Sequence, residues 1–494
     1  MVFGSSRGLE GDPLLNANID KMAWVGNTNV VIGATDAESN ANPAIKGSVY
    51  GGGENGHNYQ DAHVTIHSGT IGIADPQIDG GARYSTRGNV YGGGCGTDTF
   101  DRGEGDDKKT YYDFNAGIVM GNTQIDIDGG HIVHNVYGGG AMGSVGTYTF
   151  ADAAYNTEHP EVPVGMPISC AANTGLCTIN ITGGKIGMTN ATMTGHGTDG
   201  PDDFGHVFGA GRGYSKDPDL YPNIESSAFF NNTALNISGS AFICGSVYGG
   251  SESGHVLNNT NVNMSGGQIG CAIDRDTPYT DDDFINQATL YGTAHWTYTA
   301  GGMGAPYDQY ADTPGYDAKG GATVGTDGRT FYGNVFAGGS GYYPYAPGKW
   351  LKSAGHIGGT ASVTVSGGHI LNNLYGGCEM ADIDGAVTVT MTGGTVGVPR
   401  HHEVIAANPN YGNVYGAGMG DKRIFFNTST NVASTTIDIS NGTVYGAVYG
   451  GGEDGHVMGN ATTTISQPEG KTTVIGCNGQ SGYDGNVFGA SPRS

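Results

Sequence analysis

The sequence is short of several residue types on which common protein classes depend. Only 21 of the 494 residues are lysine or arginine, against 46 aspartates and glutamates, which gives a formal charge of −25. A surface of this sign repels phosphate backbones and anionic lipid, so nucleic acid is excluded as a partner. The sequence also has no apolar run long enough for a transmembrane segment and no secretion signal with a basic start and an apolar core.

The low proline content and the cysteine pattern exclude further classes of protein. Proline contributes only 18 residues and the 92 glycines do not fall at every third position, so a collagen triple helix is excluded. The seven cysteines include no Cys-x-x-Cys pair, which argues against a structural zinc site. Cys170 and Cys177 lie close enough in one loop to form a disulfide, and we expect the other cysteines to be buried thiols.

What the chain has instead is an internal repeat. Eleven copies of Val-Tyr-Gly-Gly-Gly, or of a close variant, follow one another at spacings that are mostly 39 to 47 residues. The copies begin at Val2, Val49, Val90, Val136, Val207, Val247, Val335, Leu374, Val414, Val448 and Val487. Such self-similarity is typical of stacked repeats, in which each unit buries its apolar face only against its neighbours.

A second motif is an alternating segment that ends in two glycines, as in residues 125–130 (Ile-Asp-Ile-Asp-Gly-Gly). Alternation with a period of two predicts a β-strand with one apolar face, and the glycine pair supplies the positive φ of a tight corner. The two motifs keep a constant phase, since 17 residues separate Val49 from Ile66 and also Val448 from Ile465. This phase indicates that both motifs belong to one structural unit.

The two motifs together predict an all-β fold, namely a parallel β-solenoid (β-helix) of about eleven coils with corner loops of varying length. A coil without a loop measures 26 residues, from Gly367 to Gly393, which accommodates three short strands at ~3.3 Å per residue. The constant phase counts against an antiparallel sandwich or propeller, and we favour a right-handed over a left-handed coil. We expect one interior column to contain Val49, Val90, Val136, Val247, Leu374, Val414 and Val448.

We interpret residues 1–494 as a single repeat array. The motif Gly-x-Glu-x-Gly-His recurs at Glu54, Glu252 and Glu453, at spacings of 198 and 201 residues, which indicates a longer super-repeat. This gives two complete super-repeats, 2–206 and 207–413, and a partial third, 414–494. The second super-repeat contains a large loop insertion at 271–334. The two ends of the sequence fall at related points of the repeat, so we expect neighbouring repeats of a longer chain.

The phrase Asn-Val-Tyr-Gly-Gly-Gly at 89–94 and 135–140, alternating with Val-Thr-Val-Ser-Gly-Gly-His-Ile at 363–370, resembles the glycine-rich repeats of very large predicted surface proteins of gut-associated Gram-negative bacteria. The resemblance covers essentially the whole chain. The resemblance implies that the protein is exported, is attached to the cell surface and has an adhesin-like or structural role. It carries over no catalytic residue.

Two kinds of site are suggested by residue type. Calcium prefers hard oxygen ligands, which Asp98 offers in a Gly-Gly-x-Gly-x-Asp match and which Asp281, Asp282 and Asp283 offer in an acidic loop. A chance match and a solvated loop are the alternatives, and no motif requires a cofactor. The three Glu-x-Gly-His copies lie too far apart to share an ion, so we expect these histidines to contact backbone carbonyls.

Aromatic residues gather in and just after the largest insertion. Exposed rings on a rigid scaffold can stack on sugars or anchor a protein partner, although an insertion that folds back into its own small core is the alternative. The candidate ligand-binding residues are Trp296, Tyr298, Tyr342, Tyr343 and Trp350.

These observations favour a non-catalytic extracellular or cell-surface module, adhesin-like or a structural stalk. Its corner loops would bind host or matrix glycans or surface proteins. No nucleophile elbow, His-Glu-x-x-His pair or phosphate-binding loop is present in the sequence. The alternative is a carbohydrate-active β-helix resembling a polysaccharide lyase or a glycoside hydrolase.

Overall fold

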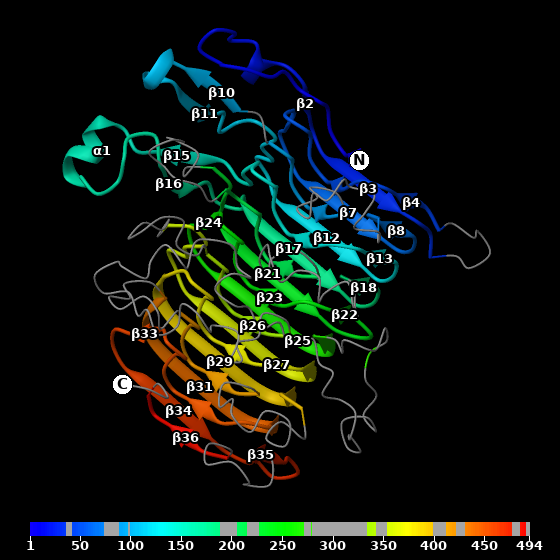
Figure 1. Cartoon of the computed structure of the whole chain (residues 1–494), viewed down its shortest axis with the longest axis vertical. Coiled ribbons are helices and arrows are strands. Elements are labelled where there is room, and N and C mark those ends of the chain that lie inside the picture. The colour runs from blue at the N-terminus through cyan, green and yellow to red at the C-terminus, as the bar shows by residue number, and fades with distance from the viewer. Residues whose placement is uncertain are drawn as a thin grey trace.

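The chain folds almost entirely into β-strands. The computed structural model describes residues 1–35, 42–73, 88–96, 99–187, 205–214, 227–270, 278, 333–341, 353–398, 412–420, 430–476 and 485–490. Figure 1 shows the strands side by side in chain order, with the two termini at opposite ends of the stack. Within the described residues the helices are α1 (Ala153–Glu158) and the single-turn segments η1 (Ile19–Lys21) and η3 (Gly105–Asp107). The predicted all-β class is confirmed.

The first large sheet has eleven strands of two residues each, and every strand pairs in parallel with the next copy along the chain. These are β1 (Val2–Phe3), β5 (Val49–Tyr50), β9 (Val90–Tyr91), β14 (Val136–Tyr137), β19 (Val207–Phe208), β23 (Val247–Tyr248), β26 (Val335–Phe336), β28 (Leu374–Tyr375), β30 (Val414–Tyr415), β32 (Val448–Tyr449) and β36 (Val487–Phe488). The repeated motif therefore marks one strand per repeat.

The second large sheet has seventeen strands and is also parallel. Its longer strands carry the alternating motif: β3 (Thr28–Ile32), β7 (Ala62–Ile66), β12 (Thr123–Ile127), β17 (Leu176–Ile181), β21 (Asn232–Ile237), β25 (Thr260–Ile269), β27 (Ala361–Ile370), β29 (Ile383–Val396), β31 (Asn431–Val444) and β34 (Ala461–Ile465). Its shorter strands are β4 (Ala44–Ile45), β8 (Thr70–Ile71), β13 (His131–Ile132), β18 (Lys185–Ile186), β22 (Phe242–Ile243), β33 (His456–Val457) and β35 (Thr473–Ile475).

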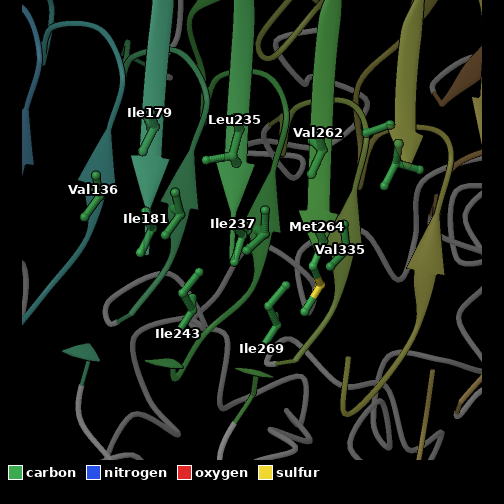
Figure 2. Packing of buried hydrophobic residues seen from close by; sticks show 14 of the residues in the cluster. Val136, Ile179, Ile181, Leu235, Ile237, Ile243, Val262, Met264, Ile269 and Val335 are labelled. Atoms are coloured by element: carbon green, nitrogen blue, oxygen red, sulfur yellow. The ribbon is translucent and has the colours of Figure 1, made fainter. Parts of the chain in front are cut away.

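The two sheets enclose one apolar interior. Figure 2 shows Ile179 and Ile181 of β17 beside Leu235 and Ile237 of β21, and all four belong to the same buried cluster as Val136 of the first sheet. The seven residues of the predicted interior column are all fully buried, and pairing in register places them one above another. That prediction is confirmed.

The second residue of each short strand points away from this interior, because successive side chains alternate across a strand. These residues form an unbroken stack of eleven rings from Phe3 to Phe488, with neighbouring ring centroids 4.6 to 5.1 Å apart. Most of these rings are buried in a second apolar cluster. The repeat therefore has two buried layers, one aliphatic and one aromatic.

The residue that precedes each short strand forms a buried polar ladder. The side chain of Asn89 accepts the backbone N–H of Asn135 at 3.0 Å, and the side chain of Asn135 accepts the N–H of His206 at 2.9 Å. The ladder continues from repeat to repeat as far as Ala447. A buried N–H without an acceptor is costly, so this position selects side chains that can accept.

Four two-stranded pairs lie beside the large sheets. The antiparallel pairs are β10 (Thr99–Arg102) with β11 (Lys109–Tyr112), and β15 (Tyr148–Phe150) with β16 (Pro167–Cys170). The parallel pairs are β2 (Trp24–Val25) with β6 (His57–Asn58), and β20 (Phe229–Phe230) with β24 (His255–Val256). Figure 1 shows the antiparallel pairs and α1 projecting from the same side of the stack.

The expected disulfide between Cys170 and Cys177 is wrong. Both thiols are free, and the Sγ of Cys170 lies 3.2 Å from the Oγ1 of Thr174 instead. Cys177 is fully buried in the main apolar cluster at an inward-facing position of β17, so packing determines the direction of its side chain. Proximity in sequence does not give the two thiols a shared direction.

Candidate functional site

The candidate residues named from the sequence lie outside the described residues. This applies to the aromatic set, Trp296, Tyr298, Tyr342, Tyr343 and Trp350, and to the calcium set, Asp98, Asp281, Asp282 and Asp283. Both sets stay predictions. Within the part of the chain that the structure describes, no group of three or more His, Cys, Asp or Glu side chains is placed to hold a metal ion.

The histidine of the Glu-x-Gly-His motif behaves as expected at its first copy. His57 is buried in β6, and its Nδ1 lies 3.2 Å from the backbone carbonyl oxygen of Met22. Burial lowers the pKa of His57, while the charge of Asp20 acts in the opposite direction. The predicted contact with a backbone carbonyl is therefore confirmed for His57.

The glutamates of the second and third copies serve the aromatic stack, a role that the sequence did not reveal. The Tyr375 hydroxyl donates to Glu453 at 2.6 Å, and the Tyr137 hydroxyl donates to Glu252. Glu379, which lies outside the motif, accepts from Tyr248 at 2.8 Å in the same way. Burial, and next the charge of Glu453, raise the pKa of Tyr375 well above its ordinary value, so this hydroxyl stays protonated and donates. These pairs join repeats from within and are structural.

An aromatic group with a solvent-exposed ring lies near the N-terminal end of the stack. Trp24 of β2 stacks on His57 of the paired strand β6, with 4.5 Å between ring centroids, and Tyr59 stacks on Trp24 at 4.2 Å. The indole N–H of Trp24 donates to the backbone carbonyl of Asp20 at 2.9 Å, which fixes the indole in place. Tyr59 is nevertheless 60% exposed. The group therefore offers an ordered ring to solvent.

The equivalent group at the second Glu-x-Gly-His copy, in the pair β20–β24, lacks this exposed ring. Phe229 stacks on His255 at 4.5 Å, as Trp24 does on His57, and both side chains are buried. Leu257 then stands where Tyr59 stands in the first unit, and Met458 occupies this position in the third. Because three different side chains fit there, the fold does not require an aromatic ring at Tyr59. This comparison is the signal from which the sequence could have identified it.

Acidic side chains surround the same region. The Asp12 carboxylate accepts two hydrogen bonds from the Arg102 guanidinium, at 2.7 and 2.8 Å. The Arg102 guanidinium also lies over the rings of Phe100 and Tyr111, 5.1 and 4.7 Å from their centroids. The hydrogen bond from Arg102 lowers the pKa of Asp12, so this carboxylate stays charged. The pair ties the segment before β2 to the β10–β11 hairpin.

Two further carboxyl groups, those of Asp20 and Asp113, are buried in the same region. Asp113 directly follows β11, and Asp20 lies in η1; Oδ2 of Asp113 and Oδ1 of Asp20 are both inaccessible to solvent. Burial, and next the charge of Asp20, raise the pKa of Asp113 to about 7. We call Asp12, Asp20, Trp24, His57, Tyr59, Arg102 and Asp113 the N-terminal cluster.

The outward face of the longer strands is polar and carries a ladder of its own. Asp126 of β12 accepts from Asn180 at 2.7 Å and lies 2.6 Å from the Nε2 of His63, and Asn236 donates to Asn180 at 2.9 Å. Burial opposes ionisation of Asp126, but the hydrogen bonds from Asn180 and His63 outweigh it and lower its pKa. These contacts hold neighbouring strands in register on the side facing solvent.

No protein-family model, no curated protein and no solved structure matches this chain. Among the described residues, none of the helices has the length and apolar character needed to cross a membrane. Function is therefore argued from the residues themselves, and chiefly from the N-terminal cluster.

Proposed function

We propose that this chain is a parallel β-solenoid module of an exported surface protein, a rigid stalk or adhesin that binds glycans without cleaving them. The solenoid is supported by two parallel sheets in which one strand per repeat pairs in register with the next. At ~4.8 Å per coil, eleven coils would extend roughly 50 Å.

Rigidity suits a stalk and is supported by contacts that repeat along the stack. Each aromatic contact in the eleven-ring stack adds ~0.5–1.5 kcal/mol beyond the apolar area that it buries. The side-chain ladder through Asn89 and Asn135 satisfies backbone N–H groups that would otherwise be buried without an acceptor. A stack held in this way presents its projecting segments at fixed positions.

The exposed ring of Tyr59 is the observation that carries the binding part of the proposal. Aromatic faces stack on the C–H faces of pyranose rings, and Tyr59 is already ordered by Trp24, so little side-chain entropy is lost on binding. Gln60 and Asp61 follow Tyr59 in sequence, and Asn27 accepts the backbone N–H of Asp61 at 3.0 Å; all three side chains are exposed and could bind sugar hydroxyls. The strongly acidic chain favours neutral or cationic saccharides over acidic ones.

The alternative of a glycoside hydrolase gains no support from the acidic pair in this cluster. Cleavage by two carboxyl groups requires a separation of roughly 5 to 10 Å, so that a sugar or a water fits between them. Oδ1 of Asp20 and Oδ2 of Asp113 are inaccessible to solvent, so these oxygens do not face a space that a sugar could enter.

A retention assay tests the proposal. The purified chain is passed over immobilised neutral glycans and mucin-type glycoprotein, and the eluate is assayed for reducing ends and unsaturated sugars. We expect retention without product, and about tenfold weaker retention for Tyr59→Ala, because a stacking ring contributes ~1–2 kcal/mol. The control is Phe150→Ala, which removes another exposed ring, 41% exposed, from the β15–β16 hairpin. Release of product would favour the enzyme, and equal loss in both variants would contradict a site at Tyr59.

A further inference from the structure

The eleven-ring stack contains two runs of three consecutive tyrosines. Within each run, neighbouring ring centroids lie 4.7 to 5.1 Å apart and the ring planes are tilted by only 7 to 11°. All six side chains are at most 2% exposed. The runs are Tyr50, Tyr91 and Tyr137, and Tyr375, Tyr415 and Tyr449. Because a phenol gives up an electron more easily than the ring of phenylalanine does, each run is a column of oxidisable rings shielded from water.

The first tyrosine of the second run has its hydroxyl held between a carboxylate and an amide. The Tyr375 hydroxyl donates to Glu453 at 2.6 Å and accepts from the side-chain amide of Asn373 at 3.0 Å. Tyr375, Glu453 and Asn373 are all at most 4% exposed. The phenol therefore has a base for its proton and a donor for its oxygen, both supplied by the chain.

A carboxylate accepts from two more tyrosines of the stack. The Tyr137 hydroxyl, at the end of the first run, donates to Glu252 and accepts from the side-chain amide of Asn135 at 3.3 Å. Tyr248, which stacks between two phenylalanine rings, donates to Glu379 at 2.8 Å. Each run of three tyrosines thus has one glutamate, at the ring that adjoins a phenylalanine.

Packing alone does not explain these glutamates, as the middle ring of the second run indicates. The Tyr415 hydroxyl accepts from the side-chain amide of Asn413 at 3.0 Å, just as Tyr375 accepts from Asn373. Within the part of the chain that the structure describes, no carboxylate accepts from Tyr415, although this ring is fully buried in the same stack. A tyrosine can therefore occupy the stack without a glutamate, so the base at Tyr375 calls for another explanation.

We propose that each tyrosine run conducts an electron vacancy between repeats and holds it as a neutral tyrosyl radical at the ring paired with glutamate, Tyr375 or Tyr137. A one-electron oxidant, such as a radical, removes one electron from a ring of the run, and the vacancy passes between stacked rings. At Tyr375 the phenolic O–H bond breaks and its proton moves to Glu453. The neutral acid and Asn373 then both donate to the phenoxyl oxygen. A one-electron reductant returns the electron, and the proton returns from Glu453.

Light-driven oxidation followed by electron paramagnetic resonance tests this inference. The probe is a ruthenium(III) tris-bipyridine cation generated by a light flash, which takes up one electron and is attracted to this acidic chain. Exposed rings are oxidised as well, and their radicals decay rapidly. We expect an additional tyrosyl signal in the wild-type chain that lives at least about tenfold longer, because hydrogen bonds to charged groups stabilise the paired site. The test does not depend on whether the chain binds glycans.

Two sets of substitutions identify the site. The first replaces the three bases by isosteric amides that can accept but do not take up a proton: Glu252→Gln, Glu379→Gln and Glu453→Gln together. The second removes the three paired hydroxyls: Tyr137→Phe, Tyr248→Phe and Tyr375→Phe together. Each set should shorten the lifetime of the radical about tenfold. Phenylalanine already packs in the stack at Phe208 and Phe336, so the second set decides the outcome if the first does not fold.

The matched control is Tyr415→Phe, which removes a buried tyrosine of the same run that has no glutamate. This variant should keep the long-lived signal, with circular dichroism as the check on folding. The inference is overturned if the wild-type chain has no long-lived tyrosyl signal, if a folded glutamine or phenylalanine set keeps the wild-type lifetime, or if Tyr415→Phe shortens it as much as they do.

Discussion

The side-chain oxygen of Asn373 accepts the backbone N–H of Asn413 at 2.8 Å, although forty residues separate the two in sequence. The side-chain amide of Asn373 in turn donates to the Tyr375 hydroxyl at 3.0 Å. One buried asparagine thus binds both the backbone of the next repeat and the tyrosine of its own repeat in the aromatic stack. This arrangement explains why asparagine so often precedes the Val-Tyr motif.

Replacing Asn373 by alanine is therefore expected to lower the free energy of unfolding by ~1–3 kcal/mol, because the N–H of Asn413 loses its buried acceptor. Urea unfolding measures the change. Asn261→Ala is the matched control, since Asn261 is exposed on β25 and its loss should cost no more than ~0.5 kcal/mol. Equal midpoints for the two variants would contradict a structural role for the ladder.

The glycine that follows each stacked aromatic residue allows a second test of packing between repeats. Two glycines at this same position of the motif can be compared. A Cβ added at Gly376 would lie 2.2 Å from the carbonyl oxygen of Gly416 in the next repeat, whereas a Cβ at Gly489 would meet nothing within 4 Å. Ala337 occupies this position in one repeat, so the stack can adjust locally. We therefore expect Gly376→Ala to cost ~1–3 kcal/mol and Gly489→Ala to cost almost nothing, both measured by thermal unfolding. A larger effect at Gly489 would mean that chain stiffness, and not the close approach, governs this position.

The interior column is tested by a buried charge. Val448 is fully buried between Val414 and Val487, so Val448→Asp should destabilise the fold by several kcal/mol, because its carboxylate would have no partner. Thr462→Asp, on the exposed face of β34 in the same repeat, is the control and should leave the melting temperature nearly unchanged. An unchanged melting temperature for Val448→Asp would remove this residue from the interior.

The sequence predicted the strands and their inward faces because these depend on neighbouring residues. A period of two determines which side of a strand is apolar, so the column through Val49 and Val448 could be read directly. The polar contacts could not be read in the same way. Tyr375 meets Glu453 at a separation of 78 residues and Tyr137 meets Glu252 at 115, since each tyrosine reaches past the adjacent repeat. Sequence spacing does not specify such a reach.

The N-terminal cluster was missed for a related reason. A search for densely spaced rings leads to the insertion that contains Trp296, whereas Trp24 and Tyr59 are brought together by the pairing of β2 with β6. Asp20 and Asp113 are 93 positions apart, and the raised pKa of Asp113 follows first from burial, which composition alone does not give. The one feature of the sequence that could have identified this site is the tyrosine at position 59, where the other two copies of the motif have Leu257 and Met458.

The aromatic residues predicted in the insertion are tested by replacing Trp296, Tyr343 and Trp350 together with alanine. If these rings bind the same polymer as Tyr59, the two sites of one chain act jointly, and losing either should weaken retention on a long glycan far more than on a short oligosaccharide. The triple variant is compared with Tyr59→Ala on columns of mucin-type glycoprotein and of a short oligosaccharide, with circular dichroism as the check on folding. Wild-type retention of a folded triple variant on both columns would assign the insertion to its own small core. Loss on the long glycan alone would support two cooperating sites.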